Sequence, residues 1–131
     1  MELSHLSAAL LVFFLAGVTG VESLLTPNIS ARAKRWPTGT PYQAQSGINN
    51  LASVVVMITL LSIEASDAAI ATLMLVVITF IALSGINHVT TAIRDKRDGK
   101  EVANIHYQRF VFAIPLTVAV GFILHNWRPF S

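Results

Sequence analysis

Four long apolar segments, each free of charged residues over its central part, dominate the sequence. A helix needs about 20 residues to cross the hydrocarbon core of a bilayer, and uncharged polar flanks bring every segment close to that length. Apolar runs of this kind are typical of membrane-spanning helices rather than of strands. The sequence therefore predicts an all-α membrane protein, a four-transmembrane-helix bundle that forms a single domain over residues 1–131. The predicted spans cover about 4–25, 47–64, 67–90 and 108–126.

The composition is typical of a chain whose solvent is lipid. Hydrophobic residues make up 53% of the sequence and charged residues only 12%, about half the charged fraction of a soluble domain. Cysteine is absent, which excludes disulfides, thiolate metal sites and cysteine nucleophiles. The net charge of +2 is small and needs no nucleic acid to explain it, so the lipid bilayer is the expected partner.

The basic residues indicate how the helices are oriented. Two loops, at about 25–46 and 89–109, carry eight of the nine lysines and arginines, and only Arg128 lies at the other end. Cytoplasmic loops of membrane proteins are enriched in these residues, so both loops are expected in the cytoplasm. The N-terminus, the short turn at 64–67 and the C-terminus then lie outside, in a cell inner membrane or another energy-transducing membrane. No Lys or Arg precedes the first segment, so we expect it to be kept rather than cleaved as a signal peptide.

Polar side chains near the cytoplasmic end of the predicted bundle are the candidate ligand or proton site, because polar groups within a bilayer are costly. Asn49 and Asn50 belong to a polar face of the second span, which is expected to turn inward. Glu22, near the end of the first span, could then meet His88, near the end of the third, and the sequence leaves open whether the two side chains touch. The candidates are Glu22, Gln45, Asn49, Asn50, Asn87 and His88.

A purely structural interpretation of these residues stays open. Hydrogen bonds between Asn, Gln and His side chains commonly hold membrane helices together without any ligand. Small residues, among them Gly17, Gly20, Gly85 and Gly121, are expected where helices pack closely. The sequence contains no phosphate-binding Gly-rich loop, no His-Glu-x-x-His helix and no Gly-x-Ser-x-Gly elbow, and it has no clear metal-ligand spacing. A role other than catalysis is therefore favoured.

One loop and the helix after it resemble a known group of proteins. The loop reads Trp-Pro-Thr-Gly-Thr-Pro-Tyr-Gln over residues 36–43, and Gly47 and Asn50-Leu51-Ala52 follow it. This pattern resembles a family of small uncharacterised bacterial membrane proteins with four predicted spans, and Gly85 to His88 matches a Gly-x-x-His in their third span. That family has an acidic residue where Gln45 stands here. The resemblance implies a four-span fold, loosely similar in architecture to the DoxX-like membrane proteins, and implies no particular activity.

Three functions are consistent with these features. The first is an accessory or structural subunit of a larger membrane complex, in keeping with the short chain and the lack of catalytic motifs. The second is a small transporter or channel that works as a homo-oligomer, with Glu22, Asn50 and His88 along its path. The third is a membrane redox protein with a cofactor or quinone between its helices, where His88 is the candidate haem ligand and a bis-histidine haem also needs His106 to turn inward. The expected partners are other membrane subunits or further copies of the chain.

Overall fold

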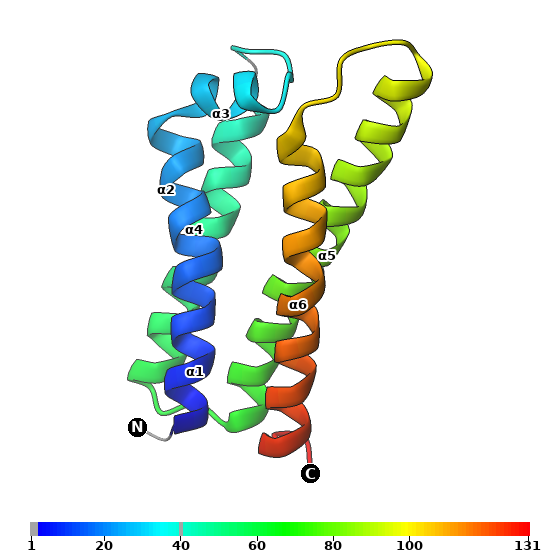
Figure 1. Ribbon diagram of the computed structural model, residues 1–131. Helices are drawn as coiled ribbons and strands as arrows, with labels where there is room; N and C mark the ends of the chain where they lie inside the picture. The colour runs from blue at the N-terminus through cyan, green and yellow to red at the C-terminus, as the bar shows by residue number, and fades with distance from the viewer. Residues whose placement is uncertain (1–2, 40) are drawn as a thin grey trace.

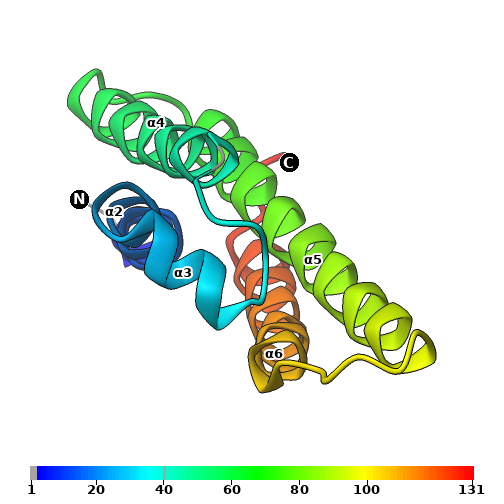
Figure 2. The same cartoon turned by 90° about the horizontal axis from the view of Figure 1, so that it is seen from above.

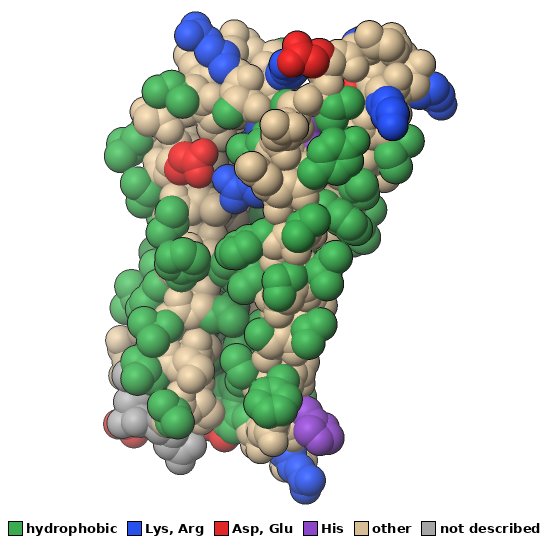
Figure 3. All heavy atoms as spheres, in the orientation of Figure 1, with side chains coloured by type: hydrophobic (Ala, Val, Ile, Leu, Met, Phe, Trp, Pro, Cys, Tyr) green, Lys and Arg blue, Asp and Glu red, His purple; other side chains and the backbone are tan. Residues whose placement is uncertain are grey.

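The computed structural model describes residues 3–39 and 41–131, and every regular element among them is a helix. Four helices are long and apolar enough to cross a membrane, as expected of a multi-pass membrane protein. The first and last described residues lie at one end of the bundle, here called the terminal end (Figure 1). Most Lys and Arg side chains gather at the opposite end, here called the basic end, while apolar side chains cover the shaft between them (Figure 3).

The first membrane-length helix, Leu3–Leu25, is continuous but changes its winding along its length. It consists of α1 (Leu3–Val12), a π-helical turn η1 (Phe13–Gly17) and α2 (Val18–Leu25). The remaining elements are α3 (Pro27–Ala33), α4 (Tyr42–Ser62), α5 (Asp67–Arg97) and α6 (Asn104–Trp127).

The segment before the second span differs from the prediction in two places. Residues 27–33 were predicted as loop, but they form α3, because Pro27 occupies its first turn, where the fixed φ of proline favours a helix. The second span begins at Tyr42 rather than near residue 47, directly after Pro41, whose backbone is already helical. Both differences place additional helix at the basic end, beside the candidate site.

The bundle consists of two helix pairs that join near the terminal end. The continuous helix Leu3–Leu25 packs along α4, and α5 packs along α6. The pairs share a core in the terminal half and diverge toward the basic end (Figures 1 and 2). The buried members of this core are Ala8, Ala9, Val12, Leu15, Ala16, Met57, Ile70, Met74, Val77, Ile78 and Val120.

A polar contact joins three helices at the terminal end. The Asp67 carboxylate at the start of α5 accepts hydrogen bonds from His5 Nε2 at 2.7 Å and from Trp127 Nε1 at 2.9 Å. The His5 and Trp127 rings also meet edge to face, with centroids 5.6 Å apart. These contacts fix the helices Leu3–Leu25, α5 and α6 at one end, so the divergence at the other end is set by packing closer to the candidate site.

Glycines set the closest helix crossings, as predicted for three of the four positions. A Cβ added at Gly20 or Gly47 meets the other glycine's carbonyl oxygen, at 3.2 Å and 2.9 Å respectively, so α2 and α4 cross there with almost no space. A Cβ at Gly85 meets Ala113 at 3.0 Å, and one at Gly17 makes an ordinary contact at 3.6 Å. The prediction for Gly121 is wrong, because nothing lies within 4 Å of a Cβ built there.

Candidate functional site

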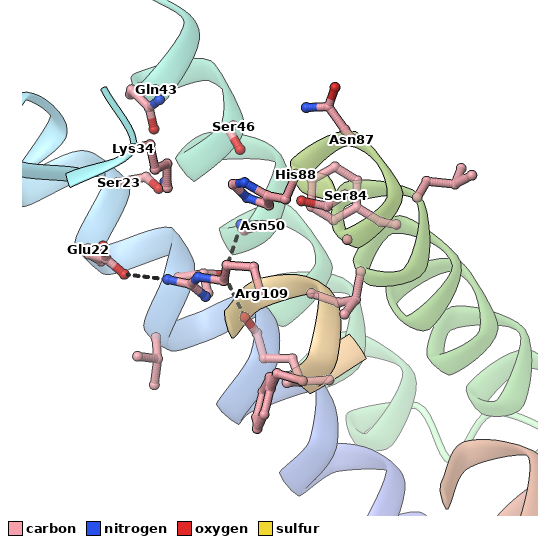
Figure 4. A pocket seen from close by; sticks show the side chains of 18 of the residues that line it. Glu22, Ser23, Lys34, Gln43, Ser46, Asn50, Ser84, Asn87, His88 and Arg109 are labelled. Atoms are coloured by element: carbon pink, nitrogen blue, oxygen red, sulfur yellow. Dashed lines mark hydrogen bonds and ion pairs between the residues drawn. The ribbon is translucent and has the colours of Figure 1, made fainter. Parts of the chain in front are cut away.

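A cavity of about 510 Å³ lies at the basic end, where the two helix pairs diverge. Its walls come from α2, α4, α5 and α6 and from the segment after α3 (Figure 4). The polar groups lie toward the basic end: Glu22, Lys34, Gln43, Ser46, Asn50, Ser84, Asn87, His88 and Arg109. The apolar groups lie deeper in the bundle and include Phe14, Val18, Phe80, Leu83 and Phe112. The cavity is therefore polar at one end and apolar at the other.

The apolar part of the cavity also reaches the outer surface of the bundle. Phe14 is 65% exposed, Val18 55% and Phe112 48%, although all three line the cavity. The first two side chains lie on the helix Leu3–Leu25, and the third lies on α6. The apolar part of the cavity is therefore bordered by side chains that are also exposed on the outside of the bundle.

The length of α5 gives the depth expected for the polar end in a bilayer. A rise of about 1.5 Å per residue places His88 roughly 32 Å along α5 from Asp67. The hydrocarbon core of a bilayer is about 30 Å thick. With Asp67 at one boundary of that core, His88 lies near the other boundary, and the apolar part of the cavity lies within the hydrocarbon.

A pair of buried histidines forms the centre of the polar end. The Nδ1 atoms of His88 on α5 and His106 on α6 are 2.8 Å apart, and the side chains are 4% and 0% exposed. His106 Nε2 lies 3.1 Å from the Lys34 backbone oxygen. The Trp36 indole stacks on the His88 ring, with centroids 5.4 Å apart and planes at 4°. Three distant parts of the chain therefore hold both rings in fixed orientations.

The hydrogen bonds of this pair assign its protons. A carbonyl oxygen only accepts, so His106 Nε2 carries a proton and donates it to Lys34. In the neutral pair His106 Nδ1 is then an acceptor, and the proton between the two Nδ1 atoms belongs to His88. His88 Nε2 is left without a proton. It has no partner among the described residues and is not enclosed, so it offers a lone pair to the cavity.

Three charged side chains surround the histidine pair. Arg109 on α6 lies 3.7 Å from the Glu22 carboxylate on α2, and this ion pair spans the gap between the helix pairs (Figure 4). Lys34 donates a hydrogen bond to Ser30 Oγ at 2.7 Å, and its ammonium lies 5.2 Å from the centroid of the Trp36 ring. Partial burial, reinforced by the nearby Arg109 charge, lowers the pKa of Lys34. The cavity thus has two basic side chains and one carboxylate.

The end of α3 positions Lys34 and Trp36. Arg35 has φ +55°, the Arg35 N–H donates to the Arg32 oxygen, and the Trp36 N–H donates to the Ala31 oxygen. This is the Schellman arrangement, which usually has glycine at the left-handed position. Here that position holds Arg35, whose guanidinium bonds the Glu101 carboxylate at 2.7 Å and the Glu101 backbone oxygen at 2.7 Å. The left-handed turn therefore ties the α3–α4 loop to the α5–α6 loop above the cavity.

Four of the six predicted candidates line the cavity, namely Glu22, Asn50, Asn87 and His88. Gln45 and Asn49 are exposed and do not line it. The inward face of α4 instead presents Gln43, Ser46 and Asn50, at the spacing of one helical face. The sequence left open whether Glu22 and His88 are in contact; in the structure Glu22 pairs with Arg109, and His88 pairs with His106. Asn50 donates to Thr19 Oγ1 at 2.9 Å, which links α4 to α2.

Sequence reasoning missed the basic wall of the cavity. Lys34 and Arg109 were read only as loop charges that set the orientation of the helices. One signal was available: His106 and Arg109 are three residues apart, at the spacing of one helical face. No local pattern connects either residue with His88 or with Lys34, because those contacts join separate parts of the chain.

The geometry also bears on cofactors. His106 does turn inward, but its Nδ1 bonds His88 directly, so the two rings do not flank a space that a bis-histidine haem requires. Among the described residues, no group of three or more His, Cys, Asp or Glu side chains is placed to hold a metal ion. What the residues can do together is accept a hydrogen bond at His88 Nε2 and attract negative charge through Lys34 and Arg109.

No protein-family model, curated protein or solved structure matches the chain. The family resemblance of residues 36–43 therefore stays a prediction, and the function is argued from the site alone.

Proposed function

We propose that the protein binds an amphipathic small molecule between its helices, with the head group at the basic end and the apolar tail in the deeper cavity. The observation that carries this proposal is the division of one cavity into a charged end and an apolar part, whose side chains are also exposed on the outside of the bundle. A volume of about 510 Å³ is within the range of small-molecule sites. A lateral opening lets a ligand enter from the membrane without exposing its tail to water.

The proposed orientation places the basic end in the cytoplasm and both chain termini outside. Lys and Arg concentrate at that end of the bundle, as the cytoplasmic loops of membrane proteins usually do (Figure 3). The membrane is then a cell inner membrane or another energy-transducing membrane, and the head group enters from its cytoplasmic leaflet.

Ligand binding favours two of the functions predicted from the sequence. A homo-oligomeric carrier and a protein with a quinone or cofactor between its helices both need a cavity of this kind, whereas a structural subunit does not. The subunit hypothesis stays a prediction, and native mass spectrometry of the protein from its own membrane would reveal a companion subunit as an added mass.

The two tryptophans provide a direct binding assay. Trp36 lines the cavity, and Trp127 bonds Asp67 at the terminal end. The variant Trp127→Phe in nanodiscs therefore has a single fluorophore at the site. A single-chain amphiphile brominated next to its head group is expected to quench Trp36 saturably at low mole fraction.

The matched control is Trp36→Phe, which keeps only the distant Trp127. Its fluorescence is expected to fall only in proportion to the bulk concentration of brominated lipid. Quenching that rises linearly in both variants, without saturation, contradicts a ligand site in the cavity.

A further inference from the structure

The cavity has an excess of positive charge that the protein itself does not neutralise. Arg109 has one carboxylate partner, Glu22, at the loose separation of 3.7 Å. Lys34 has no carboxylate partner among the described residues and bonds only the neutral Ser30 hydroxyl. A half-buried ammonium without a direct carboxylate contact favours a negatively charged ligand, because charge-assisted hydrogen bonds are stronger than neutral ones.

The neutral histidine pair opposes such a ligand. His88 Nε2 faces the cavity as an unprotonated acceptor, and an anionic oxygen offers it only further lone pairs. The conflict is removed when one proton is added. The proton settles on His88 Nε2, which becomes a donor, and the positive charge is shared with His106 through the Nδ1 proton, while His106 Nε2 keeps its bond to Lys34.

We propose that the ligand has an anionic head group, held by Lys34, Arg109 and His88, and that its binding is coupled to uptake of one proton by the His88–His106 pair. This inference rests on the proposed function, since it names the ligand class of the same cavity. Proton balance is simple: one proton leaves water, or the acid form of the ligand, and forms the N–H bond at His88 Nε2. Carboxylate and phosphate head groups share the required chemistry.

Other titratable groups near the pair limit where that proton can go. Those around the same cavity are Glu22 from α2, Lys34 after α3, Tyr42 from α4, and His106 and Arg109 from α6. Glu22 is already paired with Arg109, and the lysine and arginine are donors in their charged forms. The pair of imidazoles is the group whose free nitrogen changes from acceptor to donor when it takes up one proton.

Isothermal titration calorimetry of the full chain in nanodiscs tests both halves of this inference. Dodecanesulfonate is the first probe, because its head group stays anionic and takes up no proton. Repeating the titration near pH 7.5 in buffers of different ionisation enthalpy gives the number of protons bound, which is expected to approach about one per ligand. Laurate and dodecyl phosphate then distinguish the two natural head-group chemistries, and uncharged monolaurin is expected to bind on the order of tenfold more weakly or worse.

Two variants locate the proton. His106→Phe is expected to bind the sulfonate more weakly and to take up less than half as much proton as the wild type, because His88 then lacks a partner to share the charge. His125→Phe removes an exposed histidine on the last turn of α6, at the terminal end, and is expected to match the wild type. If His106→Phe does not fold, the number of protons that the wild type takes up in the buffer series tests the proposal by itself.

The outcomes separate this inference from the proposed function. Equal affinity for monolaurin and the anions overturns the anionic head group, while an amphiphile site stands. Tighter anion binding without proton uptake overturns the role of the histidine pair. Binding of none of the probes overturns both proposals.

Discussion

The crossing of α2 and α4 at Gly20 and Gly47 gives the most quantitative prediction about the fold. A Cβ added at Gly47 lies 2.9 Å from the Gly20 carbonyl oxygen, 2.9 Å from Leu24 Cγ and 3.1 Å from Ser23 Cβ. The first of these contacts is to backbone, which cannot rotate away, so the two helices must separate by a few tenths of an ångström. Overpacking of this kind costs about 1–3 kcal/mol, and we expect Gly47→Ala to be destabilised by about 2 kcal/mol. That changes the folding equilibrium constant roughly 30-fold.

The assay is reversible unfolding in bicelles, followed by helix content or steric trapping. Gly121→Ala is the matched control, because nothing lies within 4 Å of its added Cβ, and its stability should be unchanged or slightly raised. Separation of α2 from α4 also moves Glu22 and Asn50, so Gly47→Ala is expected to weaken amphiphile binding as well. A Gly47→Ala protein as stable as Gly121→Ala refutes the close crossing.

Three further predictions concern Lys34 at the cavity, Glu64 in the turn between α4 and α5, and Glu101 in the α5–α6 loop. Lys34→Met should raise the thermal stability of the ligand-free protein, because it removes a half-buried charge beside Arg109. The same variant should bind dodecanesulfonate more weakly, and a lower thermal stability contradicts this reasoning. Glu64→Gly should raise stability by about 0.5–1 kcal/mol, because Glu64 has φ +53° after α4, and an unchanged melting temperature counts against strain there. The hydrogen bond from Arg35 lowers the pKa of Glu101 below its ordinary value of 4.5. The ion pair therefore contributes its full stabilisation above pH 4.5, and this stabilisation is lost as the pH falls through the lowered pKa. The protection factors of the amides of residues 98–103, taken relative to intrinsic exchange at each pH, should then fall in acid in the wild type. Glu101→Gln should show low protection at all pH values, and a wild-type protection that does not change with pH contradicts the role of this ion pair.

The sequence predicted the long helices because hydropathy is a local property of each segment. Span ends were less accurate where the helix continues into water: α5 runs to Arg97, well past the predicted end near residue 90, because the polar turns after His88 keep helical hydrogen bonds. Gly99 did indicate in the sequence where α5 ends, and in the structure it takes φ +69° just beyond the helix. Short α3 was missed because it has too few residues for a periodic signal.

The candidate site was predictable only as a depth in the membrane. Polar residues near His88 mark that depth, but which of them meet depends on the rotation of each helix. Successive residues on a helix differ by about 100° in direction, so Asn50 faces α2 while Asn49 is exposed. The His88–His106 contact joins two helices across the α5–α6 loop, and no local pattern sets the rotation of either helix.

The most direct test of the central claim is native mass spectrometry of the protein extracted from its own membrane. Ser84 lines the cavity, and the variant Ser84→Trp fills it while Ser84→Ala leaves it open. We expect wild type and Ser84→Ala to retain a single amphipathic ligand, Ser84→Trp to lose it, and any companion subunit to appear as a separate added mass. A wild-type protein that retains no amphiphile, or a Ser84→Trp protein that retains it equally well, contradicts the account.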